Sequence, residues 1–409
     1  MVEGFKHTEI GTIPIDWEVK TLGEVGEVRM CRRVFNHETK EQGEIPFFKI
    51  GTFGKEPDAY ISKKLYDNYR QRFSFPKKGD ILISAAGTIG RTLIYDGSPS
   101  YYQDSNIVWI ENNETLIPNE FLFHILQVVK YSTEGGTIQR LYNSILRNTK
   151  FTCPPTKAEQ TAIATALNDA DALIQKLEQL IAKKRNIKTG AMQELLTGKK
   201  RLNGFTDDWI SEPLLNLCWF QEGPGLRNWQ FTKFGIKVIN VTNLENGFLN
   251  LDRTDRYISL EEFNRMYKHF EIDEDDIVVA SSGNSYGKVA VVRKRDLPLL
   301  MNTSVIRFKP LKNLDYNFLH EFLKSKYFKE QIDLLITGGA QPNFGPAHLK
   351  KIIVKLPKTK TEQNAIAQIL SDMDNEIQEL EMQLEKYKMM KQGMMQVLLT
   401  GKIRLNYDS

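Results

Sequence analysis

The clearest pattern of hydrophobic and polar positions is a helical seam with a period of about 3.5 residues, and it occurs twice. Apolar positions alternate in steps of four and three residues, and the second series repeats the first at a constant offset of 203. The two series are Ile163, Leu167, Ala170, Ile174, Leu177, Ile181 and Lys184, then Ile366, Leu370, Met373, Ile377, Leu380, Leu384 and Tyr387. The pattern predicts two long helices that coil on a partner helix.

The repeat is longer than the seam. Residues 156–203 return at 359–406, with 27 of the 48 aligned positions identical. Both copies begin with Thr-x-x-Glu, a capping box that satisfies the first amides of a helix. Because each chain carries both copies, we expect the two helices to pack on each other, antiparallel and with pseudo-two-fold symmetry. Dimerisation between chains is the alternative.

Glycines mark the ends and the interior of both predicted helices. Gly198 and Gly401, in the two Leu-Leu-Thr-Gly-Lys endings, suit a left-handed helix stop. Gly190 and Gly393 lie inside the helices, where glycine lowers helix propensity. We therefore predict a bend or a close helix crossing at these two inner positions.

Two diverged segments, here called the first head (1–154) and the second head (204–356), precede the helical segments 155–203 and 357–409. Each head opens with a tryptophan and an apolar strand, and then has an Asp-led strand that enters a loop of small residues. A further strand, a short helix and a double-glycine segment follow in both. Strands mixed with short helices predict α+β heads, so the fold class is α+β, with two α/β heads joined by an intramolecular coiled coil.

Composition and charge limit the class of protein. A chain of 409 residues is long enough for two or three domains, and 41% hydrophobic with 26% charged residues is typical of a soluble globular protein. No apolar stretch is long enough to span a membrane, so we expect a cytoplasmic protein. The three cysteines, Cys31, Cys153 and Cys218, are too scattered for a disulfide framework or a metal site.

The small-residue loops are the first candidates for ligand contact. Glycines let a backbone approach closely, hydroxyls and amides hydrogen-bond phosphates or base edges, and each loop ends in a cation. A plain turn between two strands is the alternative. The candidates are Ser84, Gly87, Thr88 and Arg91 in the first head, and Ser281, Asn284, Ser285, Tyr286 and Lys288 in the second.

The double-glycine segments carry amides and cations of the kind that read bases. Asn and Gln suit the N6/N7 edge of adenine, and Arg suits the O6/N7 edge of guanine. A surface loop that caps the connector helix is the alternative. The candidates are Gln139, Arg140, Asn143 and Arg147 in the first head, and Gln341, Asn343 and Lys350 in the second.

Basic clusters near the start of each head suit phosphate contact. A solvated surface is the alternative for each cluster, and Trp229 and Phe231 in the second cluster suit a core equally well. The net charge of +4 does not decide between these readings. The candidates are Arg29, Arg32 and Arg33 in the first head, and Arg227, Asn228 and Lys233 in the second.

Catalytic motifs are absent from the sequence. It contains no Walker A loop, no HExxH and no G-x-S-x-G, and its Pro-Pro at 154–155 does not match the N-P-P-[YF] motif of amino-methyltransferases. The six histidines show no ligand spacing. We therefore expect a recognition protein with no catalytic residues, no cofactor and no metal.

The whole chain resembles the specificity subunit of type I restriction-modification systems. The resemblance rests on IGTIPIDWEVKTLGEV near the N-terminus, the two T-K-x-E-Q helix starts and the two L-L-T-G-K-x-R-L endings. It implies two target recognition domains that each read one half of an asymmetric bipartite site in double-stranded DNA. It also implies two methyltransferase subunits docked on the helical regions, and restriction and translocation subunits that join through them.

Two other functions remain open from the sequence. A fused nuclease with an unrecognised site would cleave DNA on its own with magnesium. A scaffold whose heads bind proteins would show no sequence-dependent affinity for DNA.

Overall fold

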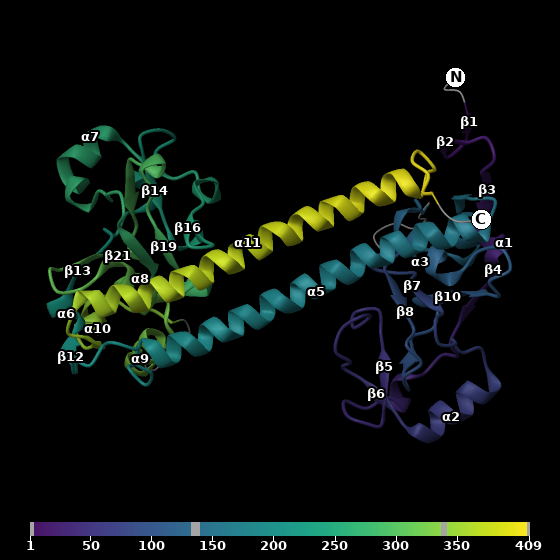
Figure 1. The fold of residues 1–409 in the computed structure, drawn as a ribbon, viewed down its shortest axis with the longest axis horizontal. Helices are drawn as coiled ribbons and strands as arrows, with labels where there is room; N and C mark the ends of the chain where they lie inside the picture. Colours follow the sequence, from purple (N-terminus) through teal and green to yellow (C-terminus); the bar gives the residue numbers. More distant parts are fainter. Residues whose placement is uncertain (1–3, 132–139, 337–341, 407–409) are drawn as a thin grey trace. The chain divides into compact units, whose positions relative to one another are not determined.

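The computed structural model describes residues 4–131, 140–336 and 342–406. Contacts divide the chain into two compact units: unit 1 comprises Met1–Glu178 with Met382–Ser409, and unit 2 comprises Gln179–Glu381. Each unit contains one head and part of both long helices, which are coloured teal and yellow in Figure 1.

The long helices are α5 (Lys157–Leu195) and α11 (Lys360–Leu398), with 39 residues each. All fourteen predicted seam positions are buried or half-buried. The prediction of two long helices in contact is therefore confirmed, because the apolar stripe of each is covered by its partner and by the heads.

Ion pairs within each unit give the direction of the two helices. In unit 1, Asp171 of α5 pairs with Lys391 at 2.6 Å, and Glu178 pairs with Lys388 at 3.2 Å. In unit 2, Arg185 pairs with Glu381 at 2.5 Å, and Lys188 pairs with Asp374. In both units the α5 numbers rise as the α11 numbers fall, so the helices are antiparallel.

The prediction of a close helix crossing at the inner glycines is wrong. A Cβ atom added at Gly190 or Gly393 would meet no heavy atom within 4 Å, and both helices continue through these positions. The inner glycines lie on solvent-exposed faces, and no packing requirement accounts for them.

The first head, in unit 1, is built on a four-stranded antiparallel sheet with strand order β4-β10-β7-β8. A smaller sheet has the order β6-β5-β9, with β5 and β9 parallel. The strands are β1 (Phe5–Thr8), β2 (Gly11–Pro14), β3 (Glu18–Thr21), β4 (Gly26–Met30), β5 (Ile45–Phe48), β6 (Tyr60–Ile61), β7 (Ile81–Ser84), β8 (Thr92–Ile94), β9 (Tyr101–Tyr102), β10 (Ile107–Asn112) and β11 (Lys150–Cys153). The helices are α1 (Leu22–Val25), α2 (Lys63–Arg72), α3 (Asn119–Val128) and α4 (Asn143–Asn148).

The main sheet of the first head separates two cores. Ile81 and Ile83 of β7 face a core shared with α3 and the helix ends, where Leu167 and Leu398 pack. Leu82, between them, faces the core of the smaller sheet. Because side chains alternate across a strand, β7 and β10 are buried on both faces, which explains their continuous apolar sequences.

The second head, in unit 2, repeats this plan. Its main sheet has the order β13-β21-β18-β19, and a smaller sheet has the order β17-β14-β20. The strands are β12 (Trp209–Pro213), β13 (Cys218–Glu222), β14 (Ile236–Ile239), β15 (Leu244–Glu245), β16 (Phe248–Leu249), β17 (Tyr257–Ile258), β18 (Ile277–Ala280), β19 (Val289–Val291), β20 (Leu299–Met301), β21 (Val305–Pro310) and β22 (Ile353–Pro357). The helices are α6 (Leu214–Leu217), α7 (Leu260–Glu262), α8 (Tyr316–Lys324), α9 (Lys326–Leu335) and α10 (Pro346–Leu349).

The strand before each long helix attaches the helix to its head. β11 pairs antiparallel with β3 and leads into α5, and β22 pairs antiparallel with β12 and leads into α11. The predicted fold class, two α+β heads joined by long helices, is thus confirmed.

Buried carboxylates of the two helix starts bind arginines of the opposite repeat copy. Glu159 accepts two hydrogen bonds from Arg404, both 2.7 Å long, within unit 1. Glu362 accepts two from Arg201, 2.8 and 2.9 Å long, within unit 2. Both carboxylates are 1% exposed, and the two pairs occupy the same positions of the repeat. The start of α5 is therefore bound to the segment that follows α11, and the start of α11 is bound to the segment that follows α5.

The first tryptophan of each head packs against a glycine that ends a long helix. Gly198 has φ +68°, and a Cβ atom there would lie 2.9 Å from the ring of Trp209. Gly401 has φ +69°, and a Cβ atom there would lie 3.2 Å from Trp17 and closer still to Pro14. The predicted left-handed stops are present, and the close approach of the rings adds a second reason for glycine.

No helix in the described part of the chain is long and apolar enough to cross a membrane.

We expect Gly190→Ala and Gly393→Ala each to raise the free energy of unfolding by about 1 kcal/mol, because alanine favours the helix and restricts the unfolded chain. Urea unfolding followed by circular dichroism measures the change. Gly198→Ala is the matched control and should destabilise, because its backbone is left-handed and the ring of Trp209 fills the space. Destabilisation by both inner substitutions would contradict the open surroundings seen here.

We expect Arg201→Ala to lower the free energy of unfolding by about 3 kcal/mol, because within the described part of the chain the buried Glu362 then keeps only the 3.2 Å hydrogen bond from the Trp209 indole. Adding Glu362→Gln should recover part of the loss, since it removes the buried charge. Lys326→Ala, which breaks the exposed pair with Glu330, is the control and should cost less than about 0.5 kcal/mol. Equal effects of Arg201→Ala and Lys326→Ala in urea unfolding would refute the structural role of the buried pair.

Candidate nucleic-acid interface

Three distant segments of the first head meet at one junction. The Ala85 amide, in the loop after β7, donates to the Asn106 carbonyl at 2.8 Å. The Leu141 amide donates to the Ala85 carbonyl at 2.9 Å, and Ala86 and Arg140 form an antiparallel bridge. The small-residue loop is therefore flanked by the turn before β10 and by the chain that follows the double glycine.

The second head has the same junction. The Ser281 amide donates to the Ser304 carbonyl at 2.9 Å, the Phe344 amide donates to the Ser281 carbonyl at 3.0 Å, and Ser282 bridges to Asn343. The structure thus brings together two sets of candidates, the small-residue loops and the double-glycine segments, that the sequence offered separately.

Internal hydrogen bonds hold the first loop in shape. The Ser84 hydroxyl is fully buried; it donates to the Thr88 carbonyl at 2.5 Å and accepts from the Arg91 amide at 2.8 Å. Gly87, with φ +65°, and Thr88 are exposed at the tip. Ser84 therefore shapes the loop, and Gly87 and Thr88 are the part of it that a ligand can touch.

A polar cleft of about 330 Å³ lies beside the first junction. Arg33 and Asp104 form a 2.8 Å ion pair there, and the Gln103 side chain accepts from the Ile50 amide at 3.0 Å. Its polar lining comprises Arg33, Asn36, Thr39, Lys49, Gln103, Asp104, Ser105, Asn106 and Arg140. Donors and acceptors gathered around a shallow cleft can bind base edges and phosphates.

Several predicted arginines of the first head are held by local partners. Arg29 pairs with Glu111 at 2.8 Å, and Arg147 pairs with Glu27 at 3.2 Å. The guanidinium of Arg32 lies over the Phe73 ring at 5.2 Å, and that of Arg91 over Phe53 at 5.5 Å, where it also donates to the Phe53 carbonyl.

The remaining candidates of the first head lie nearer the junction. Arg33 and Arg140 line the cleft, and Asn143 is exposed at the first position of α4. Gln139 lies outside the described residues. Arg33 and Arg140 are therefore the two predicted cations that the structure brings to one cleft.

In the second head, Ser285 and Tyr286 support the loop from inside. Ser285 is 8% exposed, and the Tyr286 ring packs edge-on against Phe344 while its hydroxyl donates to Asp333 at 2.8 Å. Burial, and then the Asp333 hydrogen bond, raise the pKa of Tyr286. The Ser281 hydroxyl is also buried, and it has no hydrogen-bond partner among the described atoms.

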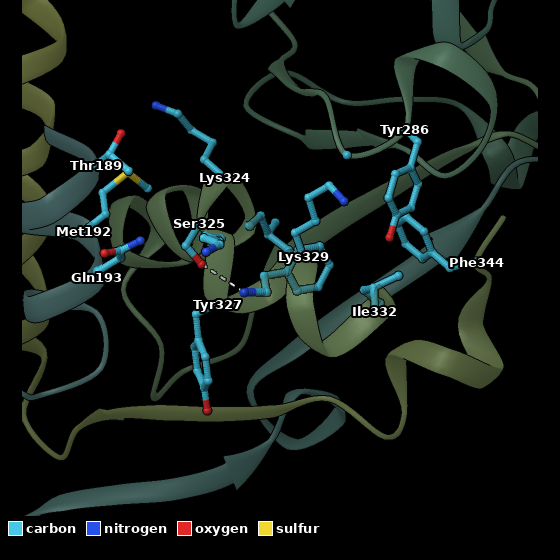
Figure 2. A pocket seen from close by; sticks show the side chains of 14 residues that line it. Thr189, Met192, Gln193, Tyr286, Lys324, Ser325, Tyr327, Lys329, Ile332 and Phe344 are labelled. Atoms are coloured by element: carbon cyan, nitrogen blue, oxygen red, sulfur yellow. Dashed lines mark hydrogen bonds between the residues drawn. The ribbon is translucent and has the colours of Figure 1, made fainter. Parts of the chain in front are cut away.

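A cavity of about 300 Å³ lies on the inner side of this loop (Figure 2). Tyr286 and Phe344 line it together with Met192 of α5 and with α9, and the Lys329 ammonium lies 4.9 Å from the centre of the Tyr286 ring. Tyr286 thus connects the junction to the packing against a long helix.

Other candidates of the second head are exposed. They are Arg227, Asn228 and Lys233 at the turn before β14, Lys288 at the loop end, Asn343 at the junction and Lys350 after α10. Phe231 packs against a core, as one reading of the sequence allowed, whereas Trp229 is 81% exposed. Gln341 and the side chain of Asn284 lie outside the described residues.

The sequence did not predict one part of the site, the turn that precedes β10 in the first head and β21 in the second. Gln103, Asp104 and Asn106 precede β10, and Asn302 and Thr303 precede β21. The signal was a short run of polar residues directly before an apolar strand, QDSN and NTS. It was missed because such a run is also ordinary turn chemistry.

A family model described as "Type I restriction modification DNA specificity domain" matches residues 14–184 and 228–386. A putative type I restriction enzyme specificity subunit of Haemophilus influenzae is 55% identical over 163 residues, 40% of this chain and 42% of that relative. The MjaVIII specificity subunit of Methanocaldococcus jannaschii is 25% identical over 429 residues, 98% of this chain and 96% of that relative.

Two solved structures share the fold. The crystal structure of a type I restriction-modification S subunit from M. genitalium has a TM-score of 0.56 and 18% identity, covering 94% of this chain and 96% of that one. A chain from a study of complex assembly and conformational transition of the type I R-M system has a TM-score of 0.56 and 14% identity, covering 96% and 99%.

We expect Arg140→Ala to weaken DNA binding by about 1–3 kcal/mol and to relax sequence preference if the guanidinium reads a base edge. Arg147→Ala is the matched control, because its guanidinium is paired with Glu27. Fluorescence anisotropy with labelled duplexes gives both affinities. An equal loss of affinity from the two substitutions would argue against base reading at this cleft.

Proposed function

Because this chain belongs to the family of type I restriction-modification DNA specificity domains, we propose that its two heads read the two halves of an asymmetric bipartite site in double-stranded DNA. In this proposal residues 1–154 and 204–356 are the two target recognition domains, and 155–203 and 357–409 are the spacer helices. A specificity subunit is a non-catalytic component of its complex, so the chemistry belongs to other subunits.

One observation carries the proposal: both heads have the same backbone junction but different side chains on it. Arg140 bridges to Ala86 in the first head, where Asn343 bridges to Ser282 in the second. Arginine suits guanine and asparagine suits adenine, so one scaffold with two sets of side chains supports the reading of two different sequences. A duplicated enzyme would instead be expected to keep the same catalytic residues in both copies.

The long helices support a spacer function. Their seam, their ion pairs and the crosswise Glu–Arg pairs make them a well-packed antiparallel pair. In this proposal the helix pair is the spacer, so the length of DNA left unread between the half-sites would follow from helix length. The exposed faces of the helices are the proposed docking surface for two methyltransferase subunits, through which restriction and translocation subunits would join.

A helix-extension experiment tests the spacer. Seven residues, one heptad, are inserted into α5 between Glu178 and Lys184 and into α11 between Glu381 and Lys388, so that the seam is preserved. The helices then lengthen by about 10 Å, which corresponds to about three base pairs. Mapping methylated adenines after expression with the methyltransferase subunits should show unchanged half-sites and a longer gap.

A heptad inserted into only one of the two helices is the control. It breaks the register of the antiparallel pair and should abolish methylation of the bipartite site. Altered half-sites with an unchanged gap would refute the spacer function. If the unmodified chain, with its partners, showed no sequence-dependent affinity for DNA, the proposal of DNA reading would itself be wrong.

A further inference from the structure

The second head exposes two large aromatic side chains on one short segment. Trp229 is 81% exposed and Phe234 is 83% exposed. Trp229 is the central residue of the 3₁₀ turn η2 (Asn228–Gln230), and the core of the smaller sheet lies on the other side of this segment. The folded chain gains little burial energy from these two rings, and two large aromatic side chains exposed on one short segment suit contact with a ligand.

The turn that carries Trp229 is fixed from below. Gln230 is buried; its side chain accepts from the Arg227 amide at 2.8 Å and donates to Glu262 at 2.5 Å and to the Tyr267 hydroxyl at 2.9 Å. Phe231 packs on the core of the smaller sheet. Trp229 is thus presented by a rigid turn, which lowers the entropy lost when its ring is immobilised by a ligand.

The first head shows where this turn lies relative to the junction. There the equivalent turn is η1 (Asn36–Glu38), which is closed by the same kind of bond, from the Phe35 amide to Glu38 at 2.8 Å. Asn36 lines the polar cleft at the first junction. In sequence order, Asn36 corresponds to Asn228 and His37 to Trp229, and this correspondence supports a position of Trp229 near the junction of the second head.

The two heads differ in what they do with this position. In the first head the His37 ring stacks on Phe35, with ring centres 5.8 Å apart and planes at 14°. In the second head the equivalent of Phe35 is Arg227, and within the described residues Trp229 has no ring partner. The first head therefore gives the aromatic ring at this position a ring partner, whereas the described residues of the second head give Trp229 none.

The charge around Trp229 suits a polyanion. Arg227 and Lys233 are exposed, and neither forms an ion pair within the part of the chain that the structure describes. Among the acidic side chains, Glu262 accepts a hydrogen bond from Gln230 on the buried side of the turn, and Asp255 lies 4.0 Å from the Lys237 ammonium. An exposed aromatic ring with an exposed cation on each side of it in the sequence suits a nucleobase flanked by phosphates.

We propose that Trp229 inserts into a base step at the half-site bound by the second head and stacks on the exposed base. This inference rests on the proposed function and goes beyond hydrogen-bond reading, because it adds a deformation of the DNA. The insertion would favour steps that unstack readily, such as pyrimidine–purine steps, and would contribute sequence preference without a hydrogen bond to a base.

The first test measures affinity. The full chain, assembled with its methyltransferase subunits, is titrated onto a duplex that carries the site found by mapping methylated adenines, and onto a scrambled duplex of equal length. Trp229→Ala should raise the Kd for the site by about tenfold, and Trp229→Phe by less than about threefold, because phenylalanine still stacks. Leu334→Ala is the control: Leu334 is 78% exposed on α9, and its removal should leave the Kd unchanged.

The salt dependence of binding separates stacking from phosphate contact. Trp229→Ala should leave the slope of log K against log salt unchanged, because the indole carries no charge. Lys233→Ala should reduce it by about one unit if the ammonium contacts a phosphate. Circular dichroism of the variants checks that the fold is intact, which is expected because the side chain is exposed.

The second test follows Trp229 directly. The difference in emission between the wild type and Trp229→Phe isolates its fluorescence from that of the other four tryptophans. The duplex should quench this emission and protect it from acrylamide. Full accessibility to acrylamide in the DNA complex, or wild-type affinity of Trp229→Ala, would overturn the proposal.

Two further outcomes would also overturn it, and they differ from each other. Protection of Trp229 by the partner subunits without DNA would make it a protein contact. A wild-type complex that binds the mapped and scrambled duplexes equally would remove the proposed reading function, and this role of Trp229 with it.

Discussion

The structure depends on one interaction, a buried carboxylate that holds an arginine from the other copy of the repeat. Glu159 with Arg404, and Glu362 with Arg201, bind the start of one long helix to the chain beyond the end of the other. Burying a charge is costly unless it is paired and hydrogen-bonded, so each carboxylate requires its bidentate partner. The helix stop, the first tryptophan of the head and the strand before the long helix lie around each pair. Their arrangement therefore depends on this bond between the two repeat copies.

The backbone of the two junctions is the same, while the side chains on it differ. In both heads the junction is made by main-chain hydrogen bonds, from Ala85 to Asn106 and from Ser281 to Ser304, and these bonds are available to any residue except proline as donor. Side chains at the junction can therefore change without loss of the backbone arrangement. The result is two heads with the same strand order in their main sheets but different polar groups at the same place.

The sequence predicted the parts of the molecule that depend on local periodicity. The seam gave both helices, because a buried stripe requires a period near 3.5, and the apolar strands β7 and β18 were visible because both of their faces are buried. The junctions could not be predicted, because they join segments far apart in the chain. The same reason explains why Arg91, offered as a phosphate contact, lies on Phe53, and why Glu362 binds Arg201.

The heads have also diverged where they meet the helices. In unit 1 His124 of α3 lies 2.9 Å from Asn168, and burial lowers its pKa, so the ring stays neutral beside the Lys391–Asp171 pair. In unit 2 the position aligned with His124 is Glu321. Burial alone would raise the pKa of Glu321, but the His320 hydrogen bond and the charges of Lys324 and Lys188 lower it to about 2, so it stays ionised. A neutral group at one end and a charged group at the other cannot be exchanged without leaving a buried charge unmatched. Each head is therefore matched to the helix segments of its own unit, so the two heads are not interchangeable.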